Sequence, residues 1–590
     1  MREAGQRITG WCLVIVTFLL PLKLGSLAAM PEQPSMFPTD FLTLAVISWP
    51  PHLTGVLGGI LLAAAVCFFP SPRWRTPGGL TALFWGIGLP LAALPGIING
   101  SNTDYVWSSA AHWAGVGSVI LSAWWIFNAD GVWKKRCLAA LAVSVLLTGV
   151  DAWRQYIWGF EEMEAMLRKQ REAGMEISNI MEIRIRDGRI FSTLGSCNTF
   201  AGFLLLTIPV VLILLWRCGR YVEPVKISQL LFTGTGILLL AVPLLMTRSR
   251  GAWLCAASSA FLWFICCKRV KKTYKIITAL CCIAVLIAGV FAVCRSGRGI
   301  LSAVERLDYC RSALIMCCEH PVAGSGWGEF FHRHMKLKLS SSDESARSPH
   351  NLPLQFACHS GIPAGIIALA AVVLLLVELF RSKSGDPLLT AGRWGILAFM
   401  LHCFMEINDV IPASMVCCAL TAMALLPHNE TPDERSLLSR TVSVSAALLL
   451  AAGAFASNFR WLQGEAAFEQ FEIALRPKMD QERVTAPDPY TVMQRLKQME
   501  YFRPRSPYPF EMAGDLFFRT GDLENAAVLF EKSRSLVPGR PAVYRRLAAV
   551  AFCRGDREKS AMYLRKAREI FPADPKNSEK AFFDIMNNRR

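Results

Sequence analysis

The amino-acid sequence predicts an all-α protein: a polytopic membrane helical bundle of about 12–13 spans, followed by α-helical repeats at the C-terminus. Three observations support this prediction. Hydrophobic residues make up 53% of the 590 residues and charged residues only 18%, which is too apolar for an ordinary soluble domain. Long apolar runs recur along the first 457 residues, and the chain after residue 506 is self-similar. The bilayer is therefore the expected solvent for most of the chain.

Thirteen apolar runs are candidate membrane spans. A spanning helix needs about 20 mostly apolar residues, and the runs approach or reach that length. They lie near residues 8–28, 53–70, 79–98, 108–128, 137–158, 191–216, 227–246, 251–267, 274–293, 352–380, 393–407, 411–426 and 441–457. The shorter run at 41–49 is bounded by prolines, so we predict an interfacial or re-entrant segment there. Small residues end the first run, which leaves a cleaved signal peptide as an alternative.

Basic residues alternate between the loops that join these runs. Lys and Arg in short loops stay on the cytoplasmic side of a membrane. Every second loop is basic, beginning with Arg2 and Arg7, whereas the loops at 29–52, 99–107 and 408–410 contain neither residue type. We therefore expect a cytoplasmic N-terminus, with 159–190, 294–351 and everything after about residue 458 outside. An error of one span would move the tail to the cytoplasm.

The net charge and the cysteines fit the same interpretation. The net charge is +17, but the basic residues form short clusters between apolar runs, so no nucleic-acid partner is expected. Many of the 19 Cys lie inside apolar runs, and none forms a zinc-type array, so we interpret most as small apolar residues. Cys310, Cys317 and Cys318 fall in the outer segment 294–351, where a disulfide is possible.

The C-terminal tail repeats with a period of 34 residues, which is the tetratricopeptide spacing. Pro507 returns as Pro541, Gly521 as Gly555, Asp522 as Asp556, and Pro538 as Pro572. We predict a transmembrane domain over 1–457, a helical connector over 458–506, two tetratricopeptide-like helix pairs over 507–574 and a tail over 575–590. Helices near 459–475 and 490–501 would cap or extend the pairs. The pattern leaves a spacer role and a protein-binding role open.

Charged residues at the mouths of the predicted spans are the candidates for chemistry, because charge at membrane depth is costly. Three such places fall on the outer side. The residues are Arg189 and Asn198 at the sixth span, Arg248 and Arg250 between the seventh and eighth spans, and His350 and Asn351 at the tenth. Arg side chains that reach for lipid headgroups, and a histidine that only starts a helix, are the alternatives. Asp409, in the short loop after the eleventh span, has two interpretations: its side chain contacts an acceptor or a neighbouring Arg, or it belongs to a plain polar turn.

Two further motifs are interpreted as structural. The run from Gly324 to Gly328 has glycines at every second position, but no strand precedes it, so a tight turn is expected. The segment from His332 to His334 has no carboxylate or Cys partner at a suitable spacing, so a solvated loop is expected. Neither a metal nor another cofactor is predicted.

The run His350-Asn351, nine residues and Gly361 is similar to a signature of the O-antigen ligase family. Ala364 stands where the family usually has Gly, Thr or Tyr. The Arg189 to Asn198 element, the Ser-Arg-Gly element that contains Arg250, and the stretch from Arg306 to Gly326 also resemble the family. Their order and placement are similar to those of the family over roughly residues 185–425.

The resemblance implies a multi-pass protein of the bacterial inner membrane. It implies metal-independent, inverting transfer of an undecaprenyl-diphosphate-linked glycan on the extracytoplasmic face. The diphosphate leaving group needs fixed cations, and Arg189, Arg248 and Arg250 are the candidates. His350 would act as the base on the acceptor hydroxyl or orient the diphosphate. Arg306, Asn198 and Asn351 are candidates for substrate binding.

The acceptor stays open between the lipid A core, a growing glycan in a polymerase, and a protein hydroxyl in a protein O-oligosaccharyltransferase. The repeats favour a protein partner or acceptor slightly, because such stacks present extended binding surfaces. A polysaccharide transporter would need charge near the bilayer midplane, whereas the charges here gather at one face. A membrane-tethered repeat scaffold would leave the clustered Arg and His unexplained.

Overall fold

Helices form almost all of the described part of the chain, which confirms the predicted fold class. The computed structural model describes residues 1–28, 37–38, 40–72, 74–101, 103–172, 182, 185–266, 271, 273, 300–339, 346–382, 385–426, 437–476, 478–480, 483–485, 487–572, 574, 577–579, 582–583 and 586. The span predicted at 274–293 lies outside these residues.

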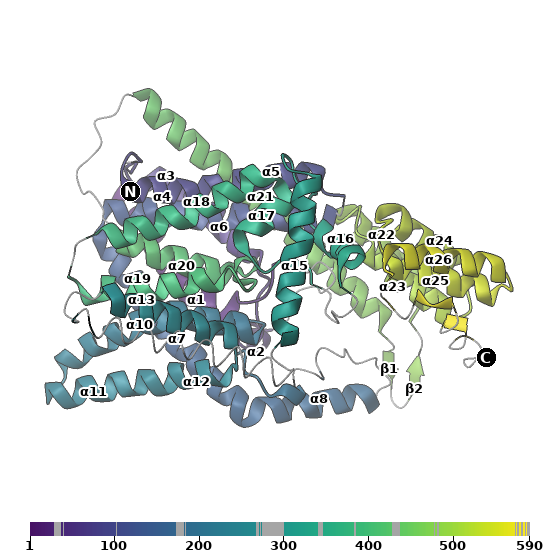
Figure 1. Cartoon of the computed structure of the whole chain (residues 1–590), viewed down its shortest axis with the longest axis horizontal. Helices are drawn as coiled ribbons and strands as arrows, with labels where there is room; N and C mark the ends of the chain where they lie inside the picture. Colours follow the sequence, from purple (N-terminus) through teal and green to yellow (C-terminus); the bar gives the residue numbers. More distant parts are fainter. Residues whose placement is uncertain are drawn as a thin grey trace.

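The bundle contains most of the apolar helices (Figure 1). In chain order it comprises α1 (Arg2–Lys23), α3 (Leu53–Phe68), α4 (Pro77–Leu83), η1 (Phe84–Gly88), α5 (Leu89–Asn99), α6 (Thr103–Ala129), α7 (Gly131–Arg154), α10 (Cys197–Cys218), α11 (Val225–Gly236), η4 (Ile237–Ala241), α12 (Val242–Met246), α13 (Arg250–Cys266), α17 (Leu352–Ser360), α18 (Ile362–Arg381), α19 (Pro387–His402), α20 (Pro412–Leu425) and α21 (Leu437–Leu475). Shorter or peripheral elements are α2 (Phe41–Val46), η2 (Gln155–Gly159), α8 (Phe160–Glu172), η3 (Gly219–Tyr221), α15 (Ile300–Glu319), α16 (Glu329–Leu337) and η5 (Asn408–Val410).

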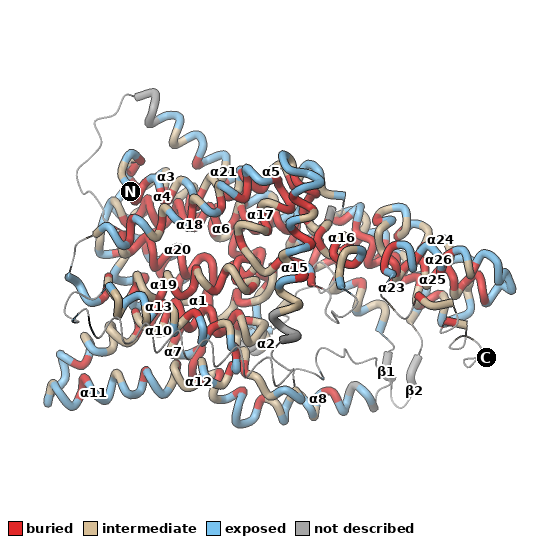
Figure 2. The backbone as a smooth tube through the Cα atoms, in the orientation of Figure 1, coloured by how far each residue is buried: buried red, intermediate tan, exposed pale blue. Residues whose placement is uncertain are grey.

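Eight of the described helices are long and apolar enough to cross a membrane. Three shorter apolar helices, α3, α13 and α20, lie among them. The centre is α6, which packs against α3, α5, α20 and α21. Figure 2 shows α6 mostly buried and α11 mostly exposed. A helix that is apolar on all sides but exposed needs lipid around it, so α11 belongs at the periphery of the bundle.

The span predicted at 352–380 is wrong as a single helix. It consists of α17 and α18, which are separated at Gly361. Gly361 has a φ of 96°, and a Cβ there would collide with the backbone of Val322. Pro363 follows at the start of α18, where its missing N–H breaks no helical hydrogen bond.

The tail begins without a break from the bundle. The predicted span at 441–457 and the predicted helix at 459–475 form one helix, α21, which crosses the boundary predicted at residue 457. A two-stranded antiparallel hairpin, β1 (Lys478–Asp480) and β2 (Arg483–Thr485), follows. Next come α22 (Pro489–Phe502) and two helix pairs, α23 (Tyr508–Arg519) with α24 (Leu523–Leu536) and α25 (Pro541–Cys553) with α26 (Arg557–Ile570).

The two helix pairs use the same residues at their turns, as the period of 34 predicts. Gly521 and Gly555 both adopt left-handed backbone, with φ of 86° and 84°. Asp522 and Asp556 each cap the following helix by accepting a hydrogen bond from the backbone N–H three residues on. Two helix pairs therefore lie in the repeated part of the chain, and their assignment as tetratricopeptide repeats stays a prediction.

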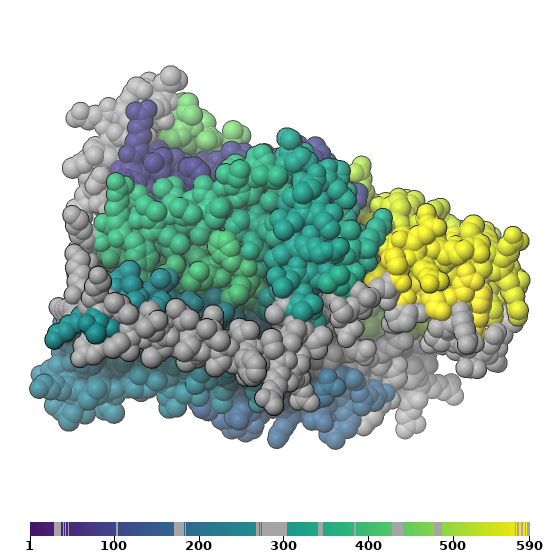
Figure 3. Space-filling model, in the orientation of Figure 1, coloured from purple at the N-terminus to yellow at the C-terminus, as the bar shows by residue number. Residues whose placement is uncertain are grey.

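The repeats pack directly on one end of the bundle (Figure 3). Helix α16 contacts α26, and Nζ of Lys338 lies 5.3 Å from the ring centre of Phe571. In the connector, the guanidinium of Arg503 pairs with Asp104 of α6 at 2.6 Å, and both side chains are at most 5% exposed. The same guanidinium stacks 4.6 Å from the ring centre of Trp461. The tail is therefore a docked module.

Replacing Arg503 by Ala should loosen this docking. Asp104 would become a buried charge without its partner, which costs about 3–5 kcal/mol. We expect a lower melting temperature and faster proteolysis between α21 and α22. The exposed Arg565 offers a control, since Arg565→Ala removes the same charge from the module surface. Equal melting and cleavage for the two variants would show that the ion pair does not hold the module.

Candidate functional site

A buried carboxylate lies at the end of the bundle that carries the repeats, in the turn after α19. The side chain of Glu406 is only 4% exposed. One oxygen accepts a hydrogen bond from Nδ2 of Asn198 at 3.0 Å and forms an ion pair with Arg306. The other oxygen lies 3.8 Å from Nδ1 of His350. Because a buried charge without partners is strongly destabilising, these contacts are what compensate the Glu406 carboxylate.

Arg189 joins this cluster through Asn198. One guanidinium nitrogen donates to Oδ1 of Asn198 at 2.8 Å, and Nε donates to the backbone oxygen of Thr247 at 2.8 Å. The Asn198 amide therefore bridges the Arg189 cation and the Glu406 carboxylate. The bond to Thr247 ties Arg189 to the junction between α12 and α13. We call Arg189, Asn198, Arg306, His350 and Glu406 the Glu406 cluster.

Helix α17 explains the spacing between Asn351 and Gly361. The nine residues between them are the whole of α17. Asn351 caps its start by accepting a hydrogen bond from the N–H of Leu354 at 3.0 Å, and its amide donates to Phe404 at 3.2 Å. Gly361 ends the helix with positive φ. The motif thus fixes His350 two residues before the first residue of a short helix, and the Asn351 side chain is hydrogen-bonded within the protein.

Residues with left-handed backbone conformation occur in the segments that contain the predicted site residues. Among the described residues, the non-glycine residues with positive φ are Ser192 at 48°, Arg248 at 51° and His350 at 54°. Each lies in one of the three segments predicted to carry chemistry. Such conformations are unfavourable for L-residues and persist where surrounding contacts enforce them, often at functional sites. For His350, the contacts include the ring of Tyr309 at 5.3 Å between ring centres.

Arg248 and Arg250 are exposed beside the Glu406 cluster. Arg248 donates to the backbone oxygen of Asp187 at 3.3 Å, and Arg250 begins α13. Helix α13 packs against α10 and α19, which carry Asn198 and lead into Glu406. The structure therefore connects four predicted residues through Glu406 and places two exposed arginines at the neighbouring junction.

A cavity of about 280 Å³ adjoins His350. Its walls include Tyr105, Trp113, Trp327, Arg347 and Gln355. Aromatic and apolar walls with a few polar groups are typical of small-molecule sites. The cavity lies on the face that carries the repeats, because Tyr105 is adjacent in sequence to Asp104, the partner of Arg503.

The prediction of a solvated loop at His332 and His334 is wrong. Both belong to α16, and their side chains are buried. The His334 ring stacks on Phe330 and meets Tyr309, and its Nδ1 lies 2.9 Å from Oγ of Ser312. The sequence signal for this burial is the helical spacing of Phe330 and His334, four residues apart.

Asp409 lies in the turn η5 and is fully buried. Its backbone oxygen lies 2.7 Å from Nε2 of His112, and neither carboxylate oxygen has a hydrogen-bond partner among the described residues. Burial raises the pKa of Asp409 to about 7. Asp409 is therefore not a member of the Glu406 cluster.

The sequence analysis did not select Glu406 as a site residue. The sequence signal for it is a carboxylate that directly follows an apolar run.

Cys310, Cys317 and Cys318 are free thiols. Within the described residues, no three His, Cys, Asp or Glu side chains lie close enough together to hold a metal ion.

Residues 235–369 match a family model described as O-Antigen ligase. The matched segment contains Arg248, Arg250, Arg306 and His350, whereas Arg189 and Asn198 precede it and Glu406 follows it. No curated protein matches the chain. The match supports the O-antigen ligase family, suggests an enzyme of glycan transfer with a lipid-linked glycan substrate, and, together with the apolar helices, suggests a multi-pass inner-membrane protein.

Protonation of His334 should destabilise the packing of α16 against α15. Burial lowers the pKa of His334 to about 4, with Asp308 opposing and Lys338 reinforcing this shift. Because the unfolded imidazole titrates near 6.5, the unfolded state binds more protons below that pH, and stability falls as the pH falls. Between pH 7.5 and 5.5 the loss is about 1 kcal/mol.

His334→Phe removes this titration but keeps a ring in the stack. We expect its melting temperature to fall less between pH 7.5 and 5.5 than that of the wild type. His320→Phe, at an exposed histidine, provides the control and should keep the wild-type slope. Identical slopes for all three proteins would contradict the assignment of a neutral, buried His334.

Proposed function

We propose that this protein transfers a polyprenyl-diphosphate-linked glycan to an acceptor hydroxyl on the extracytoplasmic face of the inner membrane, without a metal and with inversion. The observation that carries the proposal is the convergence of Arg189, Arg306 and His350 on the buried Glu406. Three cationic or titratable groups from separate parts of the chain meet there, beside two further arginines.

The arginines suit a diphosphate leaving group. Arg306 is neutralised in part by Glu406, so the larger share of the positive field comes from Arg189, Arg248 and Arg250. Guanidinium groups pair bidentately with phosphate oxygens and stay charged at all relevant pH values. Fixed cations at the point where negative charge develops stabilise the transition state. The exposed Arg248 and Arg250 would contact the diphosphate directly. Arg189, in the adjacent Glu406 cluster, would add to the positive potential around it.

His350 is the proposed base on the acceptor hydroxyl. Its ring borders the cavity of about 280 Å³, and its Nδ1 is 3.8 Å from the Glu406 carboxylate. A carboxylate at this position orients the imidazole and stabilises the imidazolium that forms when the ring accepts a proton. The acceptor would then occupy the cavity, and the diphosphate would lie on the side of Arg248 and Arg250.

Transfer to a protein hydroxyl is the second candidate, beside transfer to the lipid A core or to a growing glycan. The observation that favours it is the packing of the C-terminal helix pairs against α16, on the face that carries His350. We place the repeats outside the cytoplasm and assign them to the tetratricopeptide class. In that position they would bind a protein partner or a protein acceptor next to the site.

His350→Ala should abolish glycan transfer while the protein still inserts into the membrane. The measurement is mass analysis of lipopolysaccharide and of envelope proteins from cells that express each variant. His320→Ala is the control, because His320 is exposed and contacts Arg333 rather than the Glu406 cluster. The glycan that disappears identifies the acceptor, and unchanged transfer would remove His350 from the site.

Glu406→Gln should lower the transfer rate by about 100-fold, the scale of losing one electrostatic group in a preorganised site. The amide keeps the shape but leaves Arg306 without its ionic partner and His350 without its carboxylate. Initial rates with a purified polyprenyl-diphosphate glycan would measure the effect. Glu319→Gln, which breaks an exposed pair with Arg333, is the matched control. A rate for Glu406→Gln equal to that of the control would contradict the proposed role.

A further inference from the structure

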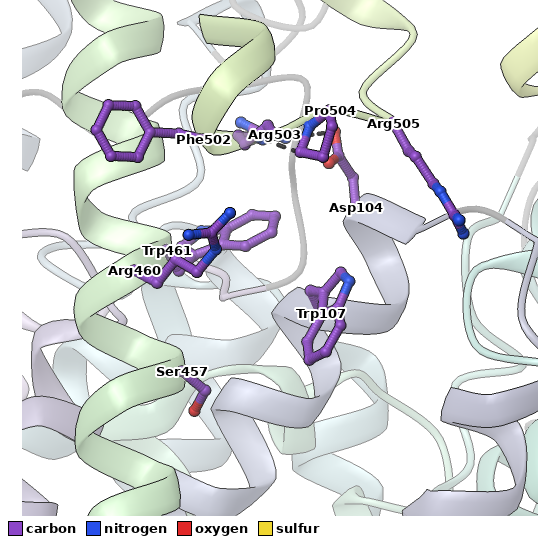
Figure 4. A pocket seen from close by; sticks show the side chains of 9 residues that line it. All are labelled: Asp104, Trp107, Ser457, Arg460, Trp461, Phe502, Arg503, Pro504 and Arg505. Atoms are coloured by element: carbon purple, nitrogen blue, oxygen red, sulfur yellow. Dashed lines mark hydrogen bonds and ion pairs between the residues drawn. The ribbon is translucent and has the colours of Figure 1, made fainter.

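Asp104 and Gln155 are buried polar side chains that each hold a distant segment of the chain in place. Asp104 pairs with Arg503 and so docks the connector on α6, as Figure 4 shows. Gln155 is the first residue of the π-helix η2, which continues α7, and its side chain is 5% exposed. It precedes the segment matched by the family model and was not among the predicted site residues. Its contacts lead to the segment that carries Arg189.

Gln155 accepts two backbone hydrogen bonds from the loop before α10. Its Oε1 accepts from the N–H of Phe191 and from the N–H of Ser192, both at 2.9 Å. A carbonyl oxygen has two lone pairs, so one side chain satisfies both donors. Ser192 has a φ of 48°, a conformation that persists where surrounding contacts enforce it. Gln155 supplies two of those contacts.

The same face of α7 also holds the side chain of Ser192. Its Oγ lies 2.8 Å from Oδ2 of Asp151 and 3.0 Å from the backbone oxygen of Thr148. Thr148, Asp151 and Gln155 are three and four residues apart, which places them on one face of the helix. The backbone and the hydroxyl of Ser192 are therefore both anchored to the end of α7.

The anchored turn determines where Arg189 lies. The guanidinium of Arg189 donates to Oδ1 of Asn198 at 2.8 Å, nine residues further along the chain. This bond requires the chain to reverse between the two residues, and the reversal occurs in the turn at Ser192. The anchored N–H of Phe191 is only two residues from Arg189. A displacement of the turn would therefore displace Arg189.

We propose that Gln155 is a positioning residue for glycan transfer: it holds the turn at Ser192 so that Arg189 keeps its place beside the diphosphate. The inference rests on the proposed function, in which Arg189 adds to the positive potential around the leaving group. Such a cation lowers the barrier because its place is fixed before the reaction. A misplacement of about 1 Å can cost up to about 100-fold in rate.

Steady-state kinetics of the purified full-length protein with a polyprenyl-diphosphate glycan test the proposal. Gln155→Leu keeps a side chain of similar size but removes the acceptor. We expect kcat to fall about tenfold while KM stays within about twofold, because the lost interaction acts mainly in the transition state. Gln155→Glu keeps an oxygen for both N–H groups and should restore most of kcat.

Gln229→Leu is the matched control. Gln229 is also buried, and it donates a hydrogen bond to the backbone oxygen of Trp216 at 3.2 Å, at the opposite end of α10 from Asn198. This variant should keep the wild-type kcat. A kcat for Gln155→Leu equal to that of the control, or a Gln155→Glu variant as slow as Gln155→Leu, would overturn the proposal.

A double-mutant cycle separates positioning from a general structural effect. Arg189→Gln removes the cation that Gln155 is proposed to position. In that background, Gln155→Leu should change kcat by less than about twofold, because residues that act through one another are not additive. The same tenfold loss in both backgrounds would show that Gln155 acts independently of Arg189. Should Gln155→Leu not fold, Gln155→Asn, whose oxygen is drawn back by one methylene, carries the same expectations.

Hydrogen–deuterium exchange provides a readout that does not depend on transfer. The peptide that contains Phe191 and Ser192 should exchange faster in Gln155→Leu than in the wild type, and at the wild-type rate in Gln229→Leu. Unchanged exchange in Gln155→Leu would refute the anchor itself. Faster exchange in a protein whose wild type transfers no glycan would refute the proposed function, and with it the positioning role, while the anchor at Gln155 stands.

Discussion

The arrangement of the site depends on the burial of one carboxylate. Glu406 lies at the end of α19 with its side chain almost fully enclosed, and a charge in that position must be compensated by close partners. Its partners are Asn198 on α10, Arg306 on α15 and His350, two residues before the start of α17, which are far apart in sequence. Each pairing therefore fixes one end of a helix relative to the others. The Glu406 carboxylate would be destabilising if it were buried alone. Its need for partners aligns Arg306, Asn198 and His350 around it.

Glycines make this alignment sterically possible. The turn after α15 packs against the C-terminal end of α17, and a Cβ at Gly324 or at Gly361 would collide with backbone atoms of the other segment. Both glycines have positive φ, which L-residues with side chains rarely adopt. The result is that α17 is held at its two ends: by the Asn351 cap beside His350 and by the Gly324 turn at the other end. A rigid nine-residue helix between two anchored ends gives His350 a defined position.

Much of this architecture is readable in the sequence, because it depends on local pattern. Apolar length predicts the helices, and the period of 34 predicts the turns at Gly521 and Gly555. Charge at the mouth of a membrane span is costly, and this rule selected Arg189, Arg248, Arg250 and His350. Arg306 was selected by the family resemblance alone. The ion pairs of Glu406 with Arg306 and of Arg503 with Asp104 were not predicted, because each joins distant segments of the chain. The burial of His334 was also missed, although the helical spacing of Phe330 and His334 indicates it. A single sequence shows that a carboxylate is present but not which cation meets it.

Helix α16 connects the repeats to the site. Successive residues of an α-helix are rotated by 100°, so side chains two positions apart point to nearly opposite sides. His332 lies beside Gly539 of the repeat module, whereas the ring of His334 meets Tyr309 edge to face, and Tyr309 in turn contacts His350. The helix is thus packed between the module and the wall of the cavity. Since packed interiors resist compression, a displacement of the module shifts α16 and the ring that supports His350. The repeat module therefore does not line the cavity itself, but it packs on α16, one side chain away from Tyr309 and His350.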